Sequence, residues 1–332
     1  MPLVSIGIVT WNSSEHLDEC VRAVRAQTHQ PIELLVADNA STDGSLELLA
    51  RAYAEVRVIR LDRNYGFTGA CNAGLRAGQG EVLVLLNNDT RVEPGWLAAL
   101  VETAESDSTV GMCASKMLFA DHPDMINSTG ISLDPVGIAW DRGGGERDDL
   151  QEQKPIEVFG PCGGAALYRR AMLDQIGLFD EDLVAYLEDL DLAWRARLAG
   201  WRCLYVPSAR VYHVHSGTWV KNSPWKSRLL GRNKVWTIAK NYSTDRLWIY
   251  LPLIVAYDLA AVIFALVTQR DINPMRGRLE GLKGLPGILR KRREVQALIQ
   301  HNRGRPWHHY LSPLELPWQV SARYQHLNRT VR

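Results

Sequence analysis

The run Val82-Leu83-Val84-Leu85-Leu86-Asn87-Asn88-Asp89-Thr90 indicates the fold class most directly, because an apolar stretch stops abruptly at two amides and a carboxylate. A short apolar run of this kind predicts a buried β-strand. Open α/β sheets bind their ligands at the edge where such strands end. Oxygen ligands of this type suit Mg²⁺ or Mn²⁺, which also take substrate phosphates as ligands. The alternative is a polar turn in which Asp89 caps the next helix.

Similar strand-like runs precede this one at residues 4–9, 32–37 and 56–61. Stretches with helical spacing follow the first and the second run, and another follows residue 89. This alternation predicts βαβ units and a mainly parallel sheet flanked by helices, which is an α/β fold of Rossmann-like type. The first strand leads into Thr10-Trp11-Asn12 and not into a Gly-x-Gly-x-x-Gly turn. That difference argues against a dinucleotide-binding dehydrogenase.

Bulk composition narrows the class of protein further. The net charge of the 332 residues is only +1, so no overall field favours nucleic acid as a partner. The 5 cysteines are scattered and include no Cys-x-x-Cys pair, which argues against a disulfide framework or a zinc site. They favour a reducing compartment. The N-terminus lacks the pattern of a signal peptide, and we therefore expect a cytoplasmic protein.

Residues 247–269 form a long apolar segment whose only charge is Asp258. As a helix of 1.5 Å rise per residue it would be about 34 Å long, enough to cross a membrane. Basic residues flank both ends, including the run 290–293, so the positive-inside bias gives no orientation. We expect a helix in the membrane interface, or a re-entrant pair with residues 279–289. The alternative is a buried helix at the interface of a homo-oligomer.

Six motifs follow one another along the chain: residues 4–12, 36–45, 64–67, 87–89, 186–195 and 212–218. In this order they resemble the motifs of inverting family 2 glycosyltransferases with the GT-A fold, particularly the branch of bacterial rhamnosyltransferases. The resemblance covers about residues 3–218 and lies in the collinearity of the motifs. It implies a catalytic domain at 1–218. Residues 219–332 are then a helical extension, for which the apolar segment 247–269 and its basic flanks predict association with a membrane.

The resemblance implies that the nucleotide is bound by residues of the first four strands. These are Thr10, Asn12, Asp38, Asn64, Gly66 and Asn88. The Asp38 carboxylate can accept the N3–H of a uracil or thymine ring, although it could also be a simple turn residue. Gly66 lets the backbone approach a ligand closely, and Arg63 could face a phosphate.

Asp89 is the expected direct ligand of Mg²⁺ or Mn²⁺. The family commonly shows an Asp-x-Asp-like motif here, whereas this chain has Asn87 and Asn88 in the first two places. Only one ionised ligand is therefore supplied, so we expect a metal that depends on the nucleotide diphosphate for further ligands.

A histidine is expected to complete the metal site. The family pattern of a histidine, a small residue and Ser or Thr matches His213, Ser216 and Thr218, which favours His213. His215, two residues on, would share its face of a strand. Either could instead be a hydrogen-bonded core histidine.

Glu188 and Asp189 form a second acidic site. Inverting transfer needs a base that takes the proton of the acceptor hydroxyl as its oxygen attacks the anomeric carbon. The resemblance implies Asp189 as this base and Glu188 as a residue that positions the acceptor. Asp191 has a simpler interpretation as an i,i+4 partner of Arg195. The alternative for all three carboxylates is an acidic first turn that the helix dipole favours.

Several glycines and tryptophans are further candidates. Gly163 and Gly164 are expected to let the chain pass close to the donor sugar or the acceptor. The glycines at 143–145 lie in an irregular stretch and suggest a mobile loop over the donor. Trp140, Trp219 and Trp225 could stack on a sugar, anchor at head groups or lie in a core.

The predicted reaction is transfer of a sugar, with L-rhamnose as the first expectation, from a dTDP- or UDP-linked donor. The acceptor would be a hydroxyl of a lipid-linked sugar or polysaccharide at the inner face of the cell membrane, in cell-wall or surface-glycan assembly. Because Asn87 and Asn88 stand where the family has an Asp-x-Asp-like motif, a non-catalytic nucleotide-sugar-binding or membrane-assembly module is an alternative function. A nucleotidyltransferase is a weaker alternative, because it normally carries a Gly-rich basic phosphate loop that is absent after Val9.

Overall fold

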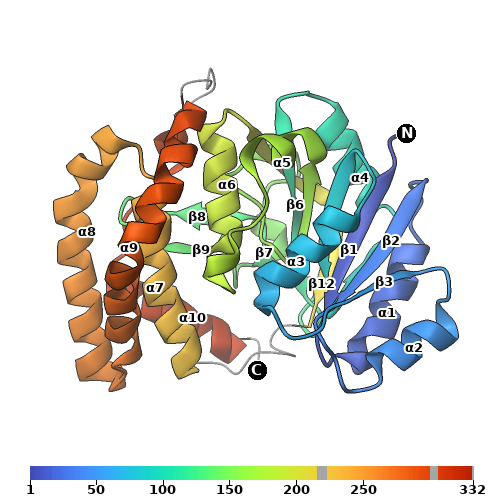
Figure 1. Cartoon of the computed structure of the whole chain (residues 1–332), viewed down its shortest axis with the longest axis horizontal. Coiled ribbons are helices and arrows are strands. Elements are labelled where there is room, and N and C mark those ends of the chain that lie inside the picture. Colours follow the sequence, from blue (N-terminus) through green and yellow to red (C-terminus); the bar gives the residue numbers. More distant parts are fainter. Residues whose placement is uncertain (215–222, 300–305, 331–332) are drawn as a thin grey trace.

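The computed structural model describes residues 1–214, 223–299 and 306–330. It consists of a large sheet between helices, joined to a group of C-terminal helices (Figure 1). His215, Ser216, Thr218 and Trp219 lie outside the described residues.

One half of the large sheet is parallel and has the strand order β4-β1-β2-β3. Its strands are β1 (Val4–Thr10), β2 (Ile32–Asp38), β3 (Arg57–Arg60) and β4 (Val82–Asn87). Along β4, Val82, Val84 and Leu86 join the core on one face of the sheet, and Leu83 and Leu85 join the core on the other face. Both faces are therefore covered, which explains the continuous apolar run, and the predicted mainly parallel sheet is confirmed.

The other half of the sheet is mixed. Strand β11 (Ala165–Arg169) runs antiparallel between β4 and β6 (Val110–Phe119), and β12 (Arg202–His213) runs parallel to β6. Three short antiparallel strands complete it: β5 (Thr90–Val92), β7 (Ile126–Ser128) and β10 (Ile156–Glu157). His213 at the end of β12 pairs with Thr90, so the register itself brings His213 beside Asp89.

Helices cover both faces of the sheet. Helices α1 (Ser14–Arg25), α2 (Ser45–Ala52) and α4 (Trp96–Glu105) contribute to one core, as their predicted apolar spacing requires. Helices α3 (Gly66–Ala77), α5 (Arg170–Ile176) and α6 (Glu188–Leu198) contribute to the other. Helix α3 begins at Gly66, inside the motif 64–67.

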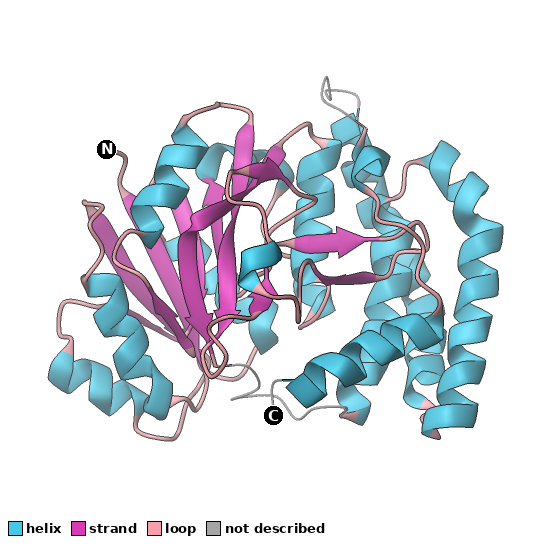
Figure 2. Ribbon diagram, turned by 180° about the vertical axis from the view of Figure 1, so that it is seen from behind, coloured by secondary structure: helices cyan, strands magenta, loops and turns pink. Residues whose placement is uncertain are grey.

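A small hairpin of β8 (Ile131–Leu133) and β9 (Ala139–Asp141) lies between the large sheet and the C-terminal helices (Figure 2). The glycine run that follows is tied down by backbone hydrogen bonds. Gly144 N donates to Asp141 O at 3.1 Å, and Gly145 N donates to Ile126 O at 2.9 Å. This arrangement differs from the free loop expected over the donor.

Helices α7 (Pro224–Asn241) and α9 (Asn273–Leu298) pack closely through glycines. A Cβ on Gly277 would overlap the carbonyl oxygen of Arg228. The C-terminal helices share a core with the α/β fold, because Tyr242 and Trp307 pack on Trp194 of α6 with ring centroids 5.0 and 4.8 Å away. Trp307 lies in the short helix Trp307–Tyr310, which precedes α10 (Pro317–Thr330).

Helix α8 (Thr244–Phe264) continues as the π-helix Ala265–Gln269 and lies at the outer edge of the molecule (Figure 1). The predicted apolar helix is thus confirmed. It is the one helix of the described part that is long and apolar enough to cross a membrane, with a mean hydropathy of 2.2 and 17% of that window buried. Its exposed side chains include Trp248, Ile249, Val255, Leu259, Ile263 and Val267.

The single charge of the apolar segment 247–269 faces the protein. Asp258 lies 2.7 Å from Lys234 Nζ of α7 and 2.7 Å from Arg278 Nη2 of α9. In the basic run, Lys291 pairs with Asp180 and Arg292 donates to backbone carbonyls. Of the four basic residues 290–293, only Arg290 and Arg293 are exposed. Two of these four charges therefore contact the protein and only the other two are available to lipid head groups.

Candidate active site

Three of the predicted nucleotide-binding residues meet at the carboxyl ends of neighbouring strands. Thr10 and Asp38 are register partners on β1 and β2, and both are buried. Asn88 Nδ2 donates to Thr10 Oγ1 at 3.0 Å. The Asp38 carboxylate accepts from Ser41 N, with both oxygens at 3.3 Å. The sheet therefore gathers a hydroxyl, an amide and a carboxylate at the edge where α/β sheets bind ligands.

The loops after β2 and β3 are joined by an asparagine that sequence analysis missed. The buried Asn39 donates from Nδ2 to Asn64 Oδ1 at 3.0 Å and to Gly66 O at 3.1 Å. Its Oδ1 accepts from Tyr65 N at 2.9 Å. Asn64 and Gly66 are thereby held beside Asp38, next to Asn39 in the chain.

Two other candidates at this edge are used within the protein. Asn12 is exposed, has a left-handed backbone with φ 50°, and accepts from Thr42 N at 2.8 Å. It ties the loop after β1 to the loop after β2. The guanidinium of Arg63 lies 4.6 Å from the centre of the Tyr65 ring.

Asp89 and His213 face one another at the end of β4. Asp89 is buried, and its Oδ1 lies 3.3 Å from His213 Nε2 and accepts no hydrogen bond from a described residue. His213 Nδ1 lies 2.9 Å from Asn127 Oδ1, which can only accept, so Nδ1 donates. In a neutral imidazole the Nε2 lone pair then points at the carboxylate. A divalent cation bound by both atoms, or a proton on Nε2, would remove the repulsion between these two electron-rich atoms, and the pair thus fits a divalent metal ion.

No group of three or more His, Cys, Asp or Glu side chains that could hold a metal occurs within the described ranges. A metal bound by Asp89 and His213 would thus need further ligands from other groups. The presence of Asn87 and Asn88 in place of an Asp-x-Asp-like motif led to the same expectation. Asn127 on β7 orients the histidine from behind, in the way that metal-binding histidines are commonly oriented. The irregular sequence around Asn127 gave no sign of this role.

Glu188 and Asp189 begin α6 and form no ion pair with any residue that the structure describes. Asp189 Oδ2 accepts from Gly163 N at 3.1 Å, and Oδ1 accepts from Leu190 N at 2.8 Å. Burial and the neighbouring carboxylates raise the pKa of Glu188 to about 8 and that of Asp189 to about 6. Asp189 is therefore a carboxylate suited to taking a proton near neutral pH.

Gly163 and Gly164 connect the two acidic sites. Gly163 N donates to Asp189, and Gly164 O accepts from Asn87 N at 2.9 Å. A Cβ on Gly164 would lie 2.9 Å from Met117 Cε and 3.3 Å from Asn87 Nδ2. The acidic helix start and the end of β4 thus lie on either side of one short glycine segment.

Asp141 is a third carboxylate at this place, which sequence analysis missed. It ends β9, is accessible to solvent, and nevertheless has a pKa that surrounding protein raises. Its charge interacts with the charges of Asp189, His213 and Lys226 of α7, so it lies near both predicted acidic sites.

Lys226, in the first turn of α7, lies near Asp141. The Lys226 ammonium lies 5.2 Å from the centre of the Tyr186 ring, and its side chain is half-buried. Burial lowers the pKa of Lys226. The exposed Trp225 packs edge-on against Tyr186 at 6.0 Å. A cation and two aromatic rings therefore stand beside the carboxylates.

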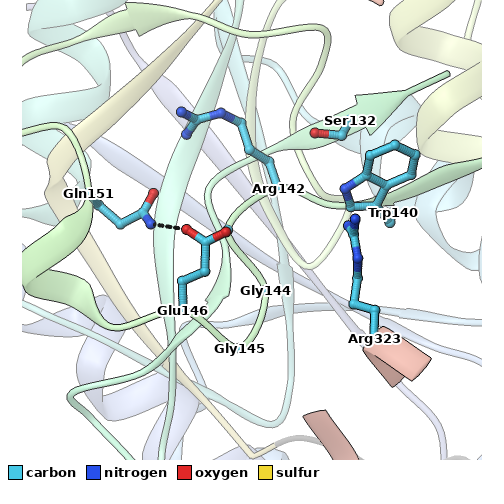
Figure 3. Close-up of a pocket in the computed structure, with 9 residues that line it drawn as sticks. Ser132, Trp140, Arg142, Gly144, Gly145, Glu146, Gln151 and Arg323 are labelled. Carbon is cyan, nitrogen blue, oxygen red and sulfur yellow. Dashed lines mark hydrogen bonds between the residues drawn. The ribbon is translucent and has the colours of Figure 1, made fainter. Parts of the chain in front are cut away.

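A polar pocket of about 450 Å³ is formed around Trp140, whose neighbour Asp141 points to the other face of β9. Arg323 of α10 stacks on Trp140 at 4.5 Å, and Gln151 Nε2 donates to Glu146 at 2.7 Å (Figure 3). Trp140 thus lines this pocket and not the cleft of Asp189.

Comparison with known proteins gives a family and a fold. The family model "Glycosyl transferase family 2" matches residues 5–177. The chain is 30% identical over 241 residues to N-acetylglucosaminyl-diphospho-decaprenol L-rhamnosyltransferase of Mycobacterium tuberculosis, covering 64% of this chain and 75% of that protein. It is 28% identical over 235 residues to the succinoglycan biosynthesis protein ExoO of Rhizobium meliloti, covering 66% and 62%.

Two solved structures share the fold. The mannosyltransferase PcManGT from Pyrobaculum calidifontis, in complex with GDP-Man and Mn²⁺, has a TM-score of 0.53 at 17% identity, covering 91% of this chain and 87% of that chain. GalNAc-T7 with UDP, GalNAc and Mn²⁺ has a TM-score of 0.60 at 19% identity, covering 85% of this chain and 55% of that chain. The expected GT-A fold is thereby confirmed.

Proposed function

The chain belongs to glycosyl transferase family 2, and from that premise we propose that it transfers a sugar from a nucleoside diphosphate donor to a hydroxyl group with inversion. The observation that carries this proposal is the pairing of two different acidic sites around Gly163 and Gly164. One, Asp89 with His213, fits a cation. The other, Asp189, has a raised pKa and only backbone hydrogen-bond donors.

In the proposed mechanism, Thr10, Asp38 and Asn88 hold the nucleotide, and Asn39 fixes the loops around it. Asp89 and His213 would hold Mg²⁺ or Mn²⁺. Such an ion, when bound, stabilises negative charge on a leaving diphosphate. These residues place the donor so that its anomeric carbon faces the second site.

Asp189 takes the proton of the acceptor hydroxyl as the oxygen of that hydroxyl attacks from the face opposite the diphosphate. A base of this kind typically contributes about 10²–10⁴-fold. Glu188 has a pKa raised to about 8 and is protonated at neutral pH, so it can donate a hydrogen bond to the acceptor. The configuration at the anomeric carbon inverts because one displacement occurs.

The donor is proposed to carry L-rhamnose on dTDP, with a UDP-sugar as the alternative. The support is the name of the relative from Mycobacterium tuberculosis, an L-rhamnosyltransferase whose acceptor is a diphospho-lipid. Lys226 supports an anionic acceptor of this class, because its ammonium forms no ion pair or hydrogen bond with a described residue. The product would enter a cell-wall or surface glycan.

We place the enzyme at the inner face of the cell membrane, with the exposed side of α8 against the lipid. The exposed apolar side chains lie along one helix, whereas the exposed apolar residues of a soluble monomer are usually single and scattered. Arg290 and Arg293 would meet anionic head groups. Co-sedimentation with phosphatidylglycerol vesicles tests this placement, and Leu259→Glu with Ile263→Glu should abolish it. Equal pelleting of this variant would contradict it.

The decisive experiment measures free nucleoside diphosphate after incubation with UDP-, dTDP- and GDP-sugars, Mn²⁺ and lipid-linked acceptors. Release of nucleoside diphosphate together with a longer acceptor is the expected result. Pyrophosphate release would indicate nucleotidyl chemistry instead. Binding of donors without release, across the whole panel, would indicate a non-catalytic nucleotide-sugar-binding module.

A further inference from the structure

The turn that leads into Glu188 and Asp189 has an unusual backbone. Val184, Tyr186 and Leu187 have positive φ angles of 66°, 66° and 64°. Residues other than glycine rarely adopt a positive φ angle, and this conformation persists only where the surrounding structure holds it. The segment directly before the proposed base is therefore one that needs external support.

A single buried asparagine of α7 gives much of this support. Asn233 is fully buried, and its Nδ2 donates to the carbonyl oxygens of Leu183, Ala185 and Tyr186 at 2.9, 2.9 and 2.8 Å. A carboxamide nitrogen carries two hydrogens, so the three oxygens share them. For the carbonyl oxygens of Ala185 and Tyr186, Asn233 is the one donor among the described residues, whereas Leu183 O also accepts from Ala185 N and Arg232 Nη2.

The orientation of this amide is fixed from its other side. Arg232 Nε donates to Asn233 Oδ1 at 3.0 Å, so the amide oxygen is occupied and the nitrogen must face the turn. Arg232 Nη2 donates to the carbonyl oxygens of Asp182 and Leu183 at 2.9 and 3.0 Å. Two consecutive residues of α7 thus hold the same turn.

The turn also contacts helix α3, which begins at Gly66, one of the residues predicted to bind the nucleotide. Val184 O accepts from Thr68 N at 3.1 Å, and a Cβ on Gly66 would lie 2.7 Å from Val184 Cγ1. The turn is consequently fixed between α3 and α7, and Leu187 at its end accepts the backbone hydrogen bond of Asp191 that starts α6.

We propose that Asn233 is a positioning residue that sets the backbone from which Asp189 projects toward the acceptor, a role that rests on the proposed function of Asp189 as the base. Helix α7 is then part of the catalytic unit, although it lies beyond residues 5–177 that match the family. A base must lie within hydrogen-bond reach of the proton it takes, so a small shift of this turn lowers the rate of transfer and leaves donor binding intact.

The chain offers a matched control in Asn72 of α3. It is also buried, and its Nδ2 donates to Phe179 O and Glu181 Oε1 at 2.9 Å each. Its Oδ1 accepts from Phe179 N at 3.0 Å. Asn72 therefore joins a helix to the segment just before the turn through three hydrogen bonds, compared with four for Asn233, and none of the three reaches the turn 183–187.

The test compares full-length Asn233→Ala with Asn72→Ala. We expect Asn233→Ala to lower kcat by roughly 10–100-fold, with the Kd for dTDP and Mn²⁺ unchanged in calorimetry. Asn72→Ala should lose thermal stability to a similar extent and keep the wild-type kcat of folded enzyme. A wild-type kcat in folded Asn233→Ala, or an equal loss of kcat in both variants, would overturn the proposal.

Two further measurements keep the result decisive. Asn233→Ser retains one donor in a smaller side chain and, should the alanine variant not fold, is expected to have a reduced kcat at unchanged nucleotide affinity. Wild-type kcat in Asn233→Ser would refute the positioning role. Failure of the proposed function is recognised separately, because wild-type protein would then release no nucleoside diphosphate, or Asp189→Asn would remain fully active.

Discussion

Asp189 and Asp191 lie two residues apart at the start of the same helix, yet their surroundings are opposite. Asp191 is fully buried, accepts from Arg195 Nε at 3.0 Å and Asn241 Nδ2 at 2.8 Å, and lies 2.8 Å from Lys240 Nζ. The two cations lower its pKa against the effect of burial. Asp189 receives only backbone N–H groups, and its pKa is raised.

The difference shows that the partners which the fold brings up, and not the residue type, decide the protonation behaviour of a buried carboxylate. Lys240 and Asn241 come from α7, so Asp191 serves to attach the C-terminal helices to α6. Asp189 forms no ion pair with a described residue that would hold it in the ionised form. One carboxylate therefore stabilises the structure, and its neighbour can take a proton.

The largest expected effect is that of Asp189→Asn. The amide cannot take a proton, so we expect a loss of transfer of about 10²–10⁴-fold. Nucleotide affinity with Mn²⁺ should persist, because the substitution lies away from Thr10, Asp38 and Asn88. Product release and calorimetry measure the two quantities, and full activity would remove Asp189 from the role of base.

Asp191→Asn, two residues later, should instead lower the free energy of unfolding. Asp191→Asn leaves Arg195 and Lys240 without the charge that they pair with, and breaking a buried pair costs about 3 kcal/mol or more of unfolding free energy. Urea denaturation measures this loss. The folded fraction should turn over donor at the wild-type rate, and a variant with normal stability but no activity would invalidate the comparison.

Asn127→Ala extends the comparison to the other predicted acidic site, Asp89 with His213. Asn127 accepts from His213 Nδ1, and loss of such a partner typically weakens metal binding by about 10–100-fold. Titration of Mn²⁺ into the protein with dTDP measures the affinity. The kcat at saturating Mn²⁺ should fall far less than in Asp189→Asn; wild-type affinity for Mn²⁺ would argue against His213 as a ligand.

The smallest expected effect is in the pH profile. A base must be ionised, and the pKa of Asp189 is raised from 3.8 to about 6, so kcat/KM should fall about tenfold per pH unit below about pH 6. The pKa of Asp191 is lowered from 3.8, so its stabilisation is present above that value and is lost only as the pH falls below it. At pH 5, kcat/KM should thus be about tenfold lower while circular dichroism still reports a folded protein.

Much of the fold could be predicted, because buried parallel strands and amphipathic helices leave simple patterns. The runs at β1, β2, β3 and β4 agree with the structure to within one or two residues. The pairing of Asp191 with Arg195 was also correct. Helix α3 was missed because its sequence, GFTGACNAGLRA, is rich in small residues and glycine, which favour a helix only when tertiary packing supports it.

The missed site residues are those that depend on contacts between distant segments. Asp141 and Asn127 lie on strands of three residues, which are too short to show a period of two. Asn39 and Asn233 are single asparagines whose sequence context does not show that they span two loops or hold a turn. The carboxylates Asp89 and Asp189 could be found from their motifs, but the groups that orient them could not.

The two ion pairs of Asp258 have a geometric consequence. Helix α8 cannot rotate about its own axis without separating Asp258 from Lys234 and Arg278, so its apolar side keeps one direction relative to the cleft. On a bilayer, a fixed roll angle of this kind holds the cleft at a constant height above the lipid. Acceptors whose hydroxyl stands nearer to the surface, or farther from it, would be out of reach, and the length of the acceptor would become a criterion of selection.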